Sequence, residues 1–327
     1  MRLLRKILLV AVAIGTVCAL ALPSRAAEWP DRPVKIVIPF GAGGSSDRFG
    51  RMIAKHLSTA FDQQFYVENK PGGAGATGAL QAARSEPDGY TLVIAGTAPH
   101  ITGPVMNPAI GYDPIKNFTH IAMIGGDSYL FAAHPALGVK SFVELIDRIR
   151  ANETAISCGS PGAGSIGHLM VEQLRLKAGL SGLNHVAYRG GGPLASDLLG
   201  NHVSTAAIAT MSAIEHARAG SIMPLAVAAD YRLSTLKDVP TLAELGYGEV
   251  GGSTWIWIAG PPNLPASIVT RLNYEVREFL KSPEVRQHFE REALLSKDYD
   301  VAALTRFVTD EGHRWRMVIE SAGLNKK

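Results

Sequence analysis

A glycine-rich stretch of the chain, 160–168, has the residue types of an anion-binding loop. It reads S-P-G-A-G-S-I-G-H, and Gly162, Gly164 and Gly167 match the G-x-G-x-x-G pattern of dinucleotide sites. Such sites also need an acidic residue near the end of the next strand, where it binds the ribose hydroxyls. The next predicted strand instead ends at Tyr188 and Arg189, neither of which is acidic. The loop is therefore not predicted to bind a dinucleotide.

A second match to this pattern, at Gly73, Gly75 and Gly78, fails in the same way, because the following strand ends at Gly96 and Thr97. Both loops nevertheless expose backbone N–H groups ahead of a helix N-terminus, where the helix dipole favours a negative charge. A carboxylate fits such a loop as well as a phosphate does. Four predicted strand-to-helix junctions carry a loop of this kind: PFGAGGSSD, NKPGGAGATG, SPGAGSIGH and YRGGGP.

The glycines of these loops have two explanations. They could serve only to allow a positive φ in tight connections. Alternatively, loops that gather at the carboxyl ends of parallel strands, on both sides of a cleft, could hold a ligand through their N–H groups. Because all four junctions are predicted at that edge, two in each half of the chain, we favour ligand binding.

Polar side chains beside the loops also have two interpretations. Asp47 stands where a helix N-cap belongs, a structural role that we prefer to contact with a ligand ammonium group. His168, on the first turn of a predicted helix, could lie on the surface, cap the helix or contact the ligand. Several hydroxyl groups could either cap helices or donate to a carboxylate: Ser45, Ser46, Thr97, Ser160 and Ser165.

Motifs of catalytic and metal sites are absent from the sequence. It contains no G-x-S-x-G, H-E-x-x-H, C-x-x-C or P-loop, and its ten histidines are scattered. Cys158 is the single cysteine after the N-terminal segment, so no internal disulfide is expected. We therefore predict no metal, no cofactor and no catalytic residue. An exported α/β enzyme acting on a small organic acid stays the alternative.

The first 26 residues have the pattern of a cleaved secretory signal peptide. Their apolar run, from Ile7 to Leu22, is shorter than the roughly 20 residues that span a bilayer, which disfavours an uncleaved anchor. Residues 1–26 carry four basic side chains and no acidic one, so removing them lowers the formal net charge from +3 to −1. No basic stripe is then left to bind a nucleic acid. A periplasmic protein without a nucleic-acid partner is expected.

The remaining chain of about 300 residues is longer than one compact core normally serves, so two domains are expected. Short β-branched runs alternate with helical periodicity, which predicts α/β units with mostly parallel sheets. The predicted strands are 34–40, 65–69, 91–97, 129–135, 155–159, 183–188, 203–210, 223–230 and 253–262. The last three predicted helices lie near 267–280, 283–292 and 301–321.

The division into lobes follows from the place where the pattern restarts. A second series of strands and helices begins near Gly125, and the C-terminal helices are expected to return to the first lobe. Trp255 and Trp257 alternate with isoleucine as in a strand, which predicts packing near a lobe crossing. The predicted boundaries are 1–26 for the signal peptide, 27–124 plus 252–327 for the first lobe and 125–251 for the second, with crossings near 124–126 and 249–254.

Several motifs of the chain resemble, in order and spacing, those of one protein family. They include PFGAGGSSDRFGR, ENKPGGAGATGA, EPDGYTL, SPGAGSIGHLMVEQL, VAYRGGGPLASDLLGNHV and VPTLAELG. Over nearly its whole length after the signal peptide, the chain resembles the solute-binding proteins of tripartite tricarboxylate transporters, also called Bug-type receptors. The resemblance implies a bilobed α/β periplasmic-binding-protein fold, type II-like, with two doubly wound sheets and a ligand cleft between them.

The same resemblance implies a receptor that binds a small carboxylate and delivers it to the integral membrane subunits of a transporter. We expect it to act as a monomer and to be no enzyme. In two places the chain departs from the pattern of the family. Ser204 stands where many members have an acid, and the second loop reads P-G-G-A-G rather than P-G-A-G-G.

The resemblance also implies which loops hold the ligand. In the first lobe they are 40–47 and 71–75, with Thr97 near the third strand, and in the second lobe 160–168 and 188–192. The expected ligand-binding residues are Phe40, Gly43, Gly44, Ser45, Asp47, Gly73, Ala74, Gly75, Thr97, Ser160, Gly162, Gly164, Ser165, His168, Tyr188 and Gly191.

Overall fold

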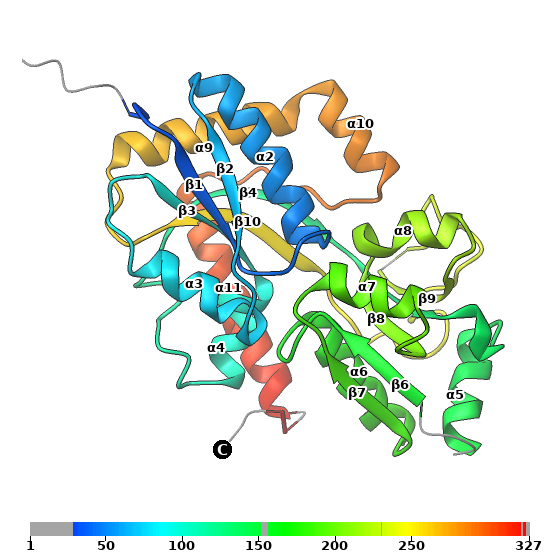
Figure 1. Ribbon diagram of the computed structural model, residues 1–327. Coiled ribbons are helices and arrows are strands. Elements are labelled where there is room, and N and C mark those ends of the chain that lie inside the picture. The colour runs from blue at the N-terminus through cyan, green and yellow to red at the C-terminus, as the bar shows by residue number, and fades with distance from the viewer. Residues whose placement is uncertain (1–28, 152–155, 230, 322, 325–327) are drawn as a thin grey trace, which may run out of the picture.

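The computed structural model describes residues 29–151, 156–229, 231–321 and 323–324. The predicted signal peptide lies outside these residues. Two sheets, each covered by helices, form two lobes that lie side by side (Figure 1). Among the described residues, no helix is long and apolar enough to span a membrane.

The first lobe contains a five-stranded sheet with the order β2-β1-β3-β10-β4. β1, β2 and β3 are parallel, and β10 runs antiparallel to both of its neighbours, β3 and β4. Four of its strands therefore point in one direction, as predicted for a mostly parallel sheet. The strands are β1 Val34–Ile38, β2 Phe65–Asn69, β3 Thr91–Gly96, β4 Thr119–Asp127 and β10 Thr254–Gly260.

The second lobe repeats this arrangement with the order β7-β6-β8-β5-β9. Here β6, β7 and β8 are parallel, and β5 is the reversed strand in the fourth place. In the chain, the reversed strand of the first sheet, β10, follows all strands of the second sheet. The reversed strand of the second sheet, β5, precedes the other strands of its own sheet. The strands are β5 Tyr129–Ala133, β6 Ile156–Ser160, β7 Leu183–Ala187, β8 Thr205–Ala209 and β9 Met223–Ala228.

Helices pack on the faces of both sheets. The C-terminal helices α9 and α11 contact β4, and α9 contacts α2, so this part of the chain lies with the first sheet (Figure 1). Those of the first lobe are α2 Ser45–Phe61, α3 Ala76–Ala83, α4 Gly103–Met106, α9 Ala266–Lys281, α10 Pro283–Arg291 and α11 Val301–Ser321. Those of the second are α5 Phe142–Ala151, α6 Ile166–Ala178, α7 Gly191–Leu199 and α8 Thr210–Arg218. Short helical turns are η1 Gly73–Gly75, the π-helical η2 Ala98–Thr102, and η3 Pro135–Leu137.

The first crossing between the sheets lies later than its predicted position near 124–126. β4 continues through the glycine pair Gly125–Gly126, and only Ser128 separates it from β5. The pair indicated a break in the sequence pattern. In the strand it makes room for Phe289 and Trp255, because ring atoms of these side chains lie 2.8 Å from the positions of added Cβ atoms. The end of β4 therefore belongs to the first sheet.

The core confirms the predicted packing of the tryptophan strand. Trp257 on β10 is fully buried, and its indole Nε1 donates a hydrogen bond of 2.9 Å to Nδ1 of His120 on β4. Trp255 packs on the aromatic ring of Phe307 of α11. Trp257 therefore links β10 to β4, and Trp255 links β10 to α11. Both contacts lie close to the place where the chain returns to the first lobe.

Candidate functional site

A cavity lies between the carboxyl edges of the two sheets. It offers about 40 Å³ to the centres of water-sized molecules, which is enough for a few waters. Its first-lobe wall is Phe40, Gly44, Ser45, Ser46, Gly96, Thr97, Ala98, Pro99 and Thr254. Its second-lobe wall is Tyr129, Pro161, Ser165, Ile166, Gly191, Ala209 and Ser212. These lining residues carry hydroxyl and backbone groups but no charged side chain.

The first-lobe wall combines a helix N-terminus with hydroxyl groups. α2 begins at Ser45, and its N-cap, Gly44, provides no side-chain cap, so the first N–H groups of the helix lack one. Thr97 directly follows β3 and is fixed by the return crossing, because its Oγ1 accepts a hydrogen bond of 2.8 Å from the Trp255 amide. A helix dipole and several hydroxyls therefore face the cavity from one side.

Asp47 does not occupy the N-cap position that the sequence indicated. Gly44 is the N-cap, because its backbone is extended and its carbonyl accepts the first helical bond, from Arg48. Asp47 instead lies in the first turn and accepts hydrogen bonds from the Gly43 amide at 3.0 Å and from Arg51 Nε at 2.9 Å. Its other oxygen accepts from Asn69 at 3.0 Å. The carboxylate therefore fixes the loop through its bonds to protein donors, and it is not among the residues that line the cavity.

The pKa of Asp47 reflects this network. Burial alone would raise the pKa, but hydrogen bonds from Arg51, the Gly43 amide and Asn69 together hold it below its ordinary value. The side chain is thus ionised and fully occupied by protein donors near neutral pH. Its geometry favours the structural one of its two predicted roles.

In the second lobe, side chains cap the loop that precedes α6. Ser165 is the N-cap, and its Oγ accepts a hydrogen bond of 3.2 Å from the His168 amide. His168 Nδ1 in turn accepts 3.0 Å from the Gly164 amide. His168 lies on the first helical turn, as predicted. It closes this loop but does not line the cavity.

The α8 helix contributes a residue that sequence reasoning missed. Ser212, on its first turn, lines the cavity, and its buried Oγ has no hydrogen-bond partner among the described residues. A buried hydroxyl without a partner loses hydrogen-bond energy that a ligand or an ordered water restores. The sequence carried no local signal for it, because no glycine-rich loop precedes α8.

The glycine-rich loops of the two lobes touch each other directly. The Gly41 amide donates a hydrogen bond of 2.9 Å to the Arg189 carbonyl across the lobes, and Thr102 Oγ1 donates to the Gly164 carbonyl. A Cβ atom built on Gly162 would lie 3.6 Å from the Ala74 Cα. The described conformation is therefore one in which the lobes are closed upon each other.

The structure brings six of the predicted ligand-binding residues to the cavity and places the other ten around it. Those that line the cavity are Phe40, Gly44, Ser45, Thr97, Ser165 and Gly191. Those in the surrounding loops and helix turns are Gly43, Asp47, Gly73, Ala74, Gly75, Ser160, Gly162, Gly164, His168 and Tyr188. Contact of either set with a ligand stays a prediction.

Asp127 is a second residue that the sequence prediction missed. It ends β4, its side chain is fully buried, and the register pairs it with Thr254 of the cavity wall. Its carboxyl oxygens accept hydrogen bonds from Ser45 Oγ at 2.6 Å, from Thr210 Oγ1 and from the Met211 amide. One carboxyl group thus links the N-termini of α2 in the first lobe and α8 in the second.

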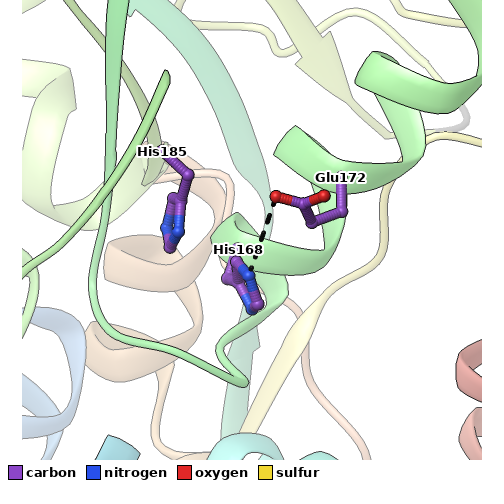
Figure 2. Close-up of side chains that lie close together, drawn as sticks. All are labelled: His168, Glu172 and His185. Atoms are coloured by element: carbon purple, nitrogen blue, oxygen red, sulfur yellow. Dashed lines mark ion pairs between the residues drawn. The ribbon is translucent and has the colours of Figure 1, made fainter. Parts of the chain in front are cut away.

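One side-chain cluster in the second lobe has atoms close enough to hold a metal. His168, Glu172 and His185 place one ligand atom each within 4.8 Å of one another (Figure 2). The two imidazole rings stack at 4.3 Å between centroids, and His168 Nε2 lies 3.9 Å from Glu172 Oε1. Burial lowers the pKa of both histidines, so the rings are neutral near pH 7.

The hydrogen bonds of this cluster favour a structural role over metal binding. His168 Nδ1 accepts the Gly164 N–H, so the proton of the neutral ring sits on Nε2, the nitrogen that faces Glu172. A metal on Nε2 would need the opposite tautomer and would break the bond to Gly164. His185 Nε2 lies 2.7 Å from Ser160 Oγ. The cluster therefore anchors the loop between β6 and α6.

Comparisons with known proteins agree with this two-lobed arrangement. The family model described as "Tripartite tricarboxylate transporter family receptor" matches residues 49–324. The chain is 31% identical to protein BugT of Bordetella pertussis over 329 residues, covering 100% of each protein. Such a match over the full length identifies the family as well as the fold.

Solved structures give the same result. The R. palustris protein Rpa4515, solved with adipate, superposes with a TM-score of 0.86 at 31% identity, covering 90% of this chain and 99% of that one. MatC of Rhodopseudomonas palustris, solved with bound malate, superposes with a TM-score of 0.83 at 26% identity, covering 89% and 100%. The predicted bilobed periplasmic-binding-protein fold is confirmed. The chain belongs to the tripartite tricarboxylate transporter receptors and is a Bug-type member of that family.

Proposed function

We propose that this protein is an extracytoplasmic solute receptor that binds a small carboxylate between its lobes and delivers it to a membrane transporter. The observation that carries the proposal is the chemistry of the cavity wall. Helix N-termini and hydroxyl groups from both lobes converge there, and none of the described residues that line it has a charged side chain. Neutral donors at helix N-termini suit a small anion that must be released again.

The ligand-bound relatives support a carboxylate in particular. Rpa4515 was solved with adipate and MatC with malate, and both superpose on this chain over most of its length. In the closed conformation the loops around the cavity are in direct contact, through Gly41 with Arg189 and through Thr102 with Gly164. We therefore expect the lobes to part for ligand entry and to close again around the bound ligand, as hinged two-lobe receptors do.

A thermal-shift panel tests the proposal directly. It contains dicarboxylates, tricarboxylates, acidic amino acids, aromatic acids and nicotinamide-type compounds, together with NAD and ATP. A matching ligand at 100 times its Kd stabilises the folded state by about 2.7 kcal/mol, so the melting temperature rises by several degrees. We expect at least one small acid to shift the curve and both nucleotides to leave it in place. A shift with NAD and with no acid would contradict the proposal.

The rival function, an exported enzyme acting on a small acid, is tested by the fate of the bound compound. A receptor returns its ligand chemically unchanged when it is denatured. Mass spectrometry of the compound that copurifies with the protein both names the ligand and shows whether it has been converted. Recovery of a product formed over many turnovers would identify an enzyme instead.

Export and partnership complete the proposal. We infer that residues 1–26 are cleaved and that the mature chain acts in the periplasm as a monomer, with integral membrane subunits of a transporter as its partners. The family match supports this assignment. N-terminal sequencing of the protein from the periplasmic fraction should begin at Ala27. Retention of Met1 in membrane fractions would contradict cleavage.

A further inference from the structure

Asp127 lies directly behind the ligand cavity, in contact with residues that line it. Ser45, which donates to its Oδ2 at 2.6 Å, forms part of the cavity wall, as do Thr254, its register partner, and Tyr129 on the next strand. The Asp127 side chain itself is fully buried and does not reach the cavity. Ser45 therefore stands between a buried carboxyl group and the proposed ligand.

The direction of the hydrogen bond between these two groups decides what Ser45 can offer to a ligand. An ionised carboxylate only accepts hydrogen bonds, so the Ser45 hydroxyl must spend its single proton on Asp127. It then presents only lone pairs to the cavity, which repel a ligand carboxylate. A protonated Asp127 reverses this, because its own O–H can donate to Ser45 Oγ and release the Ser45 proton to point at the ligand.

We propose that Asp127 and Ser45 form a proton-linked binding pair, in which uptake of one proton by Asp127 turns the Ser45 hydroxyl into a donor for the bound carboxylate. The inference rests on the proposed function, since it requires an anionic ligand in the cavity. Asp127 acts through Ser45 and is thus a positioning residue. The other contacts of Asp127 survive the change, because Thr210 and the Met211 amide can still donate to the second carboxyl oxygen.

The surroundings of Asp127 place its titration near the physiological range. Burial raises the pKa of Asp127 to about 6, against the opposing effect of hydrogen bonds from Ser45, Thr210 and the Met211 amide and of the positive charge of Arg48. From β5 the titratable neighbour is Tyr129, whose own pKa is raised by burial and by Asp127. The contacts from α8 and β10 are made by groups that do not titrate in this range.

The sign of the expected pH dependence follows from this arrangement. A bound anion next to Asp127 favours its neutral form, so the pKa of Asp127 rises further in the complex. The protonated receptor then binds more tightly, and affinity falls by up to about tenfold per pH unit between the free and the bound pKa. The ligand cannot cause this trend, because its own carboxyl groups are ionised above about pH 6.5.

Isothermal titration calorimetry with malate and adipate between about pH 6.5 and pH 8.5 tests the pair. For the wild type we expect Kd to rise at least about tenfold over this range. Titrations in two buffers of different ionisation enthalpy should show proton uptake on binding. Asp127→Asn supplies a permanent donor to Ser45, so its profile should be flat and its affinity at pH 8.5 about tenfold tighter than that of the wild type.

Two further variants keep the test decisive. Asp113→Asn changes a carboxylate that only caps a turn at Ile115 and Lys116, and it should keep the wild-type slope. If Asp127→Asn does not fold, Ser45→Ala replaces it, and it should lose most of the proton uptake.

A wild-type Kd that is independent of pH would overturn the inference, as would a folded Asp127→Asn variant that keeps the wild-type slope. If malate and adipate fail to bind at every pH while another acid in the thermal-shift panel binds, that acid takes their place in the titrations. Failure of every acid would refute the proposed function and the inference with it.

Discussion

The two lobes share one strand order, with the reversed strand in the same place, but they hold their loops in different ways. In the first lobe, the loop before α2 is fixed by a buried ionised side chain, Asp47, which binds Gly43, Arg51 and Asn69. In the second lobe, the corresponding loop before α6 is fixed by neutral caps, Ser165 and a histidine. The same topology therefore tolerates a charged anchor on one side and an uncharged one on the other.

In their glycines the two lobes are alike, because these residues let the loops of one lobe approach the backbone of the other. In the second lobe, Gly190 and Gly192 lie against the backbone of the first-lobe loop, at Gly41 and Ala42. Glycines of both lobes thus permit contact between backbones, and most of them do not face the cavity. The hydroxyls and helix N-termini supply the donors of the cavity wall. We therefore expect lobe closure to depend on the glycines and ligand contact to depend on the cavity wall.

The largest effect is expected for Gly192→Ala. A Cβ atom there would lie 1.8 Å from the Ala42 carbonyl oxygen across the lobes, although the helical position itself accepts alanine. Closure is then blocked, and we expect ligand affinity to fall about 100-fold, close to 2.7 kcal/mol. Calorimetry measures the loss. Gly312→Ala, with nothing within 4 Å of the new Cβ, is the matched control. Wild-type affinity in Gly192→Ala would show that closure does not need this contact.

Removing the charged anchor comes next. Asp47→Ala leaves the Gly43 amide and Asn69 without their acceptor, and bonds to a buried charge are typically worth about 2 kcal/mol. We expect the free energy of unfolding in urea to fall by about that amount. Because the pKa of Asp47 is lowered in the folded state, this stabilisation is present above pH 3.8 and disappears as pH falls below it. The wild type and the variant should therefore converge in acid.

The same variant decides between the two interpretations of Asp47. If its carboxylate contacted a ligand ammonium group, amino acid ligands alone would lose affinity in Asp47→Ala. A purely structural anchor affects every ligand alike, through the loop that it holds. Selective loss for amino acids, with unfolding free energy at the wild-type value, would contradict the structural role described above.

A smaller effect is expected for Gly44→Val. The Gly44 backbone is extended and accepts any side chain, but a Cβ atom would lie 3.2 Å from the Gly191 amide nitrogen. The branched side chain therefore presses on the second lobe beside the cavity. We predict a loss of affinity of about tenfold, or 1.4 kcal/mol, measured on protein with wild-type circular dichroism. Gly44→Ala should lose less, and an unaltered affinity in Gly44→Val would show this loop to be structural only.

Local pattern predicted nine of the ten described strands, because strand and helix periodicity are properties of neighbouring residues. β4 was not predicted, because its glycine pair resembles a turn in the sequence. The structure shows that the pair instead makes room for the rings of Phe289 and Trp255. The cavity was predicted only in part, because its wall joins residues far apart in the chain. Ser45 and Asp127, separated by 82 positions, meet only through the crossing of β4. The available signal in the sequence was Asp127 itself, an acidic residue in an otherwise apolar stretch.

The smallest effect concerns the neutral cap of the second lobe. Ser165→Ala removes the acceptor of the His168 amide and should lower the free energy of unfolding by about 1 kcal/mol, whereas Ser165→Gly should cost only a few tenths. Both variants lack the hydroxyl that lines the cavity. Their ligand affinities therefore distinguish its role as a helix cap from a role as a ligand donor. Because a cap acts through the loop, we expect Ser165→Ala to lose more affinity than Ser165→Gly. Equal losses would identify the hydroxyl as a ligand donor and make this wall resemble that of the first lobe.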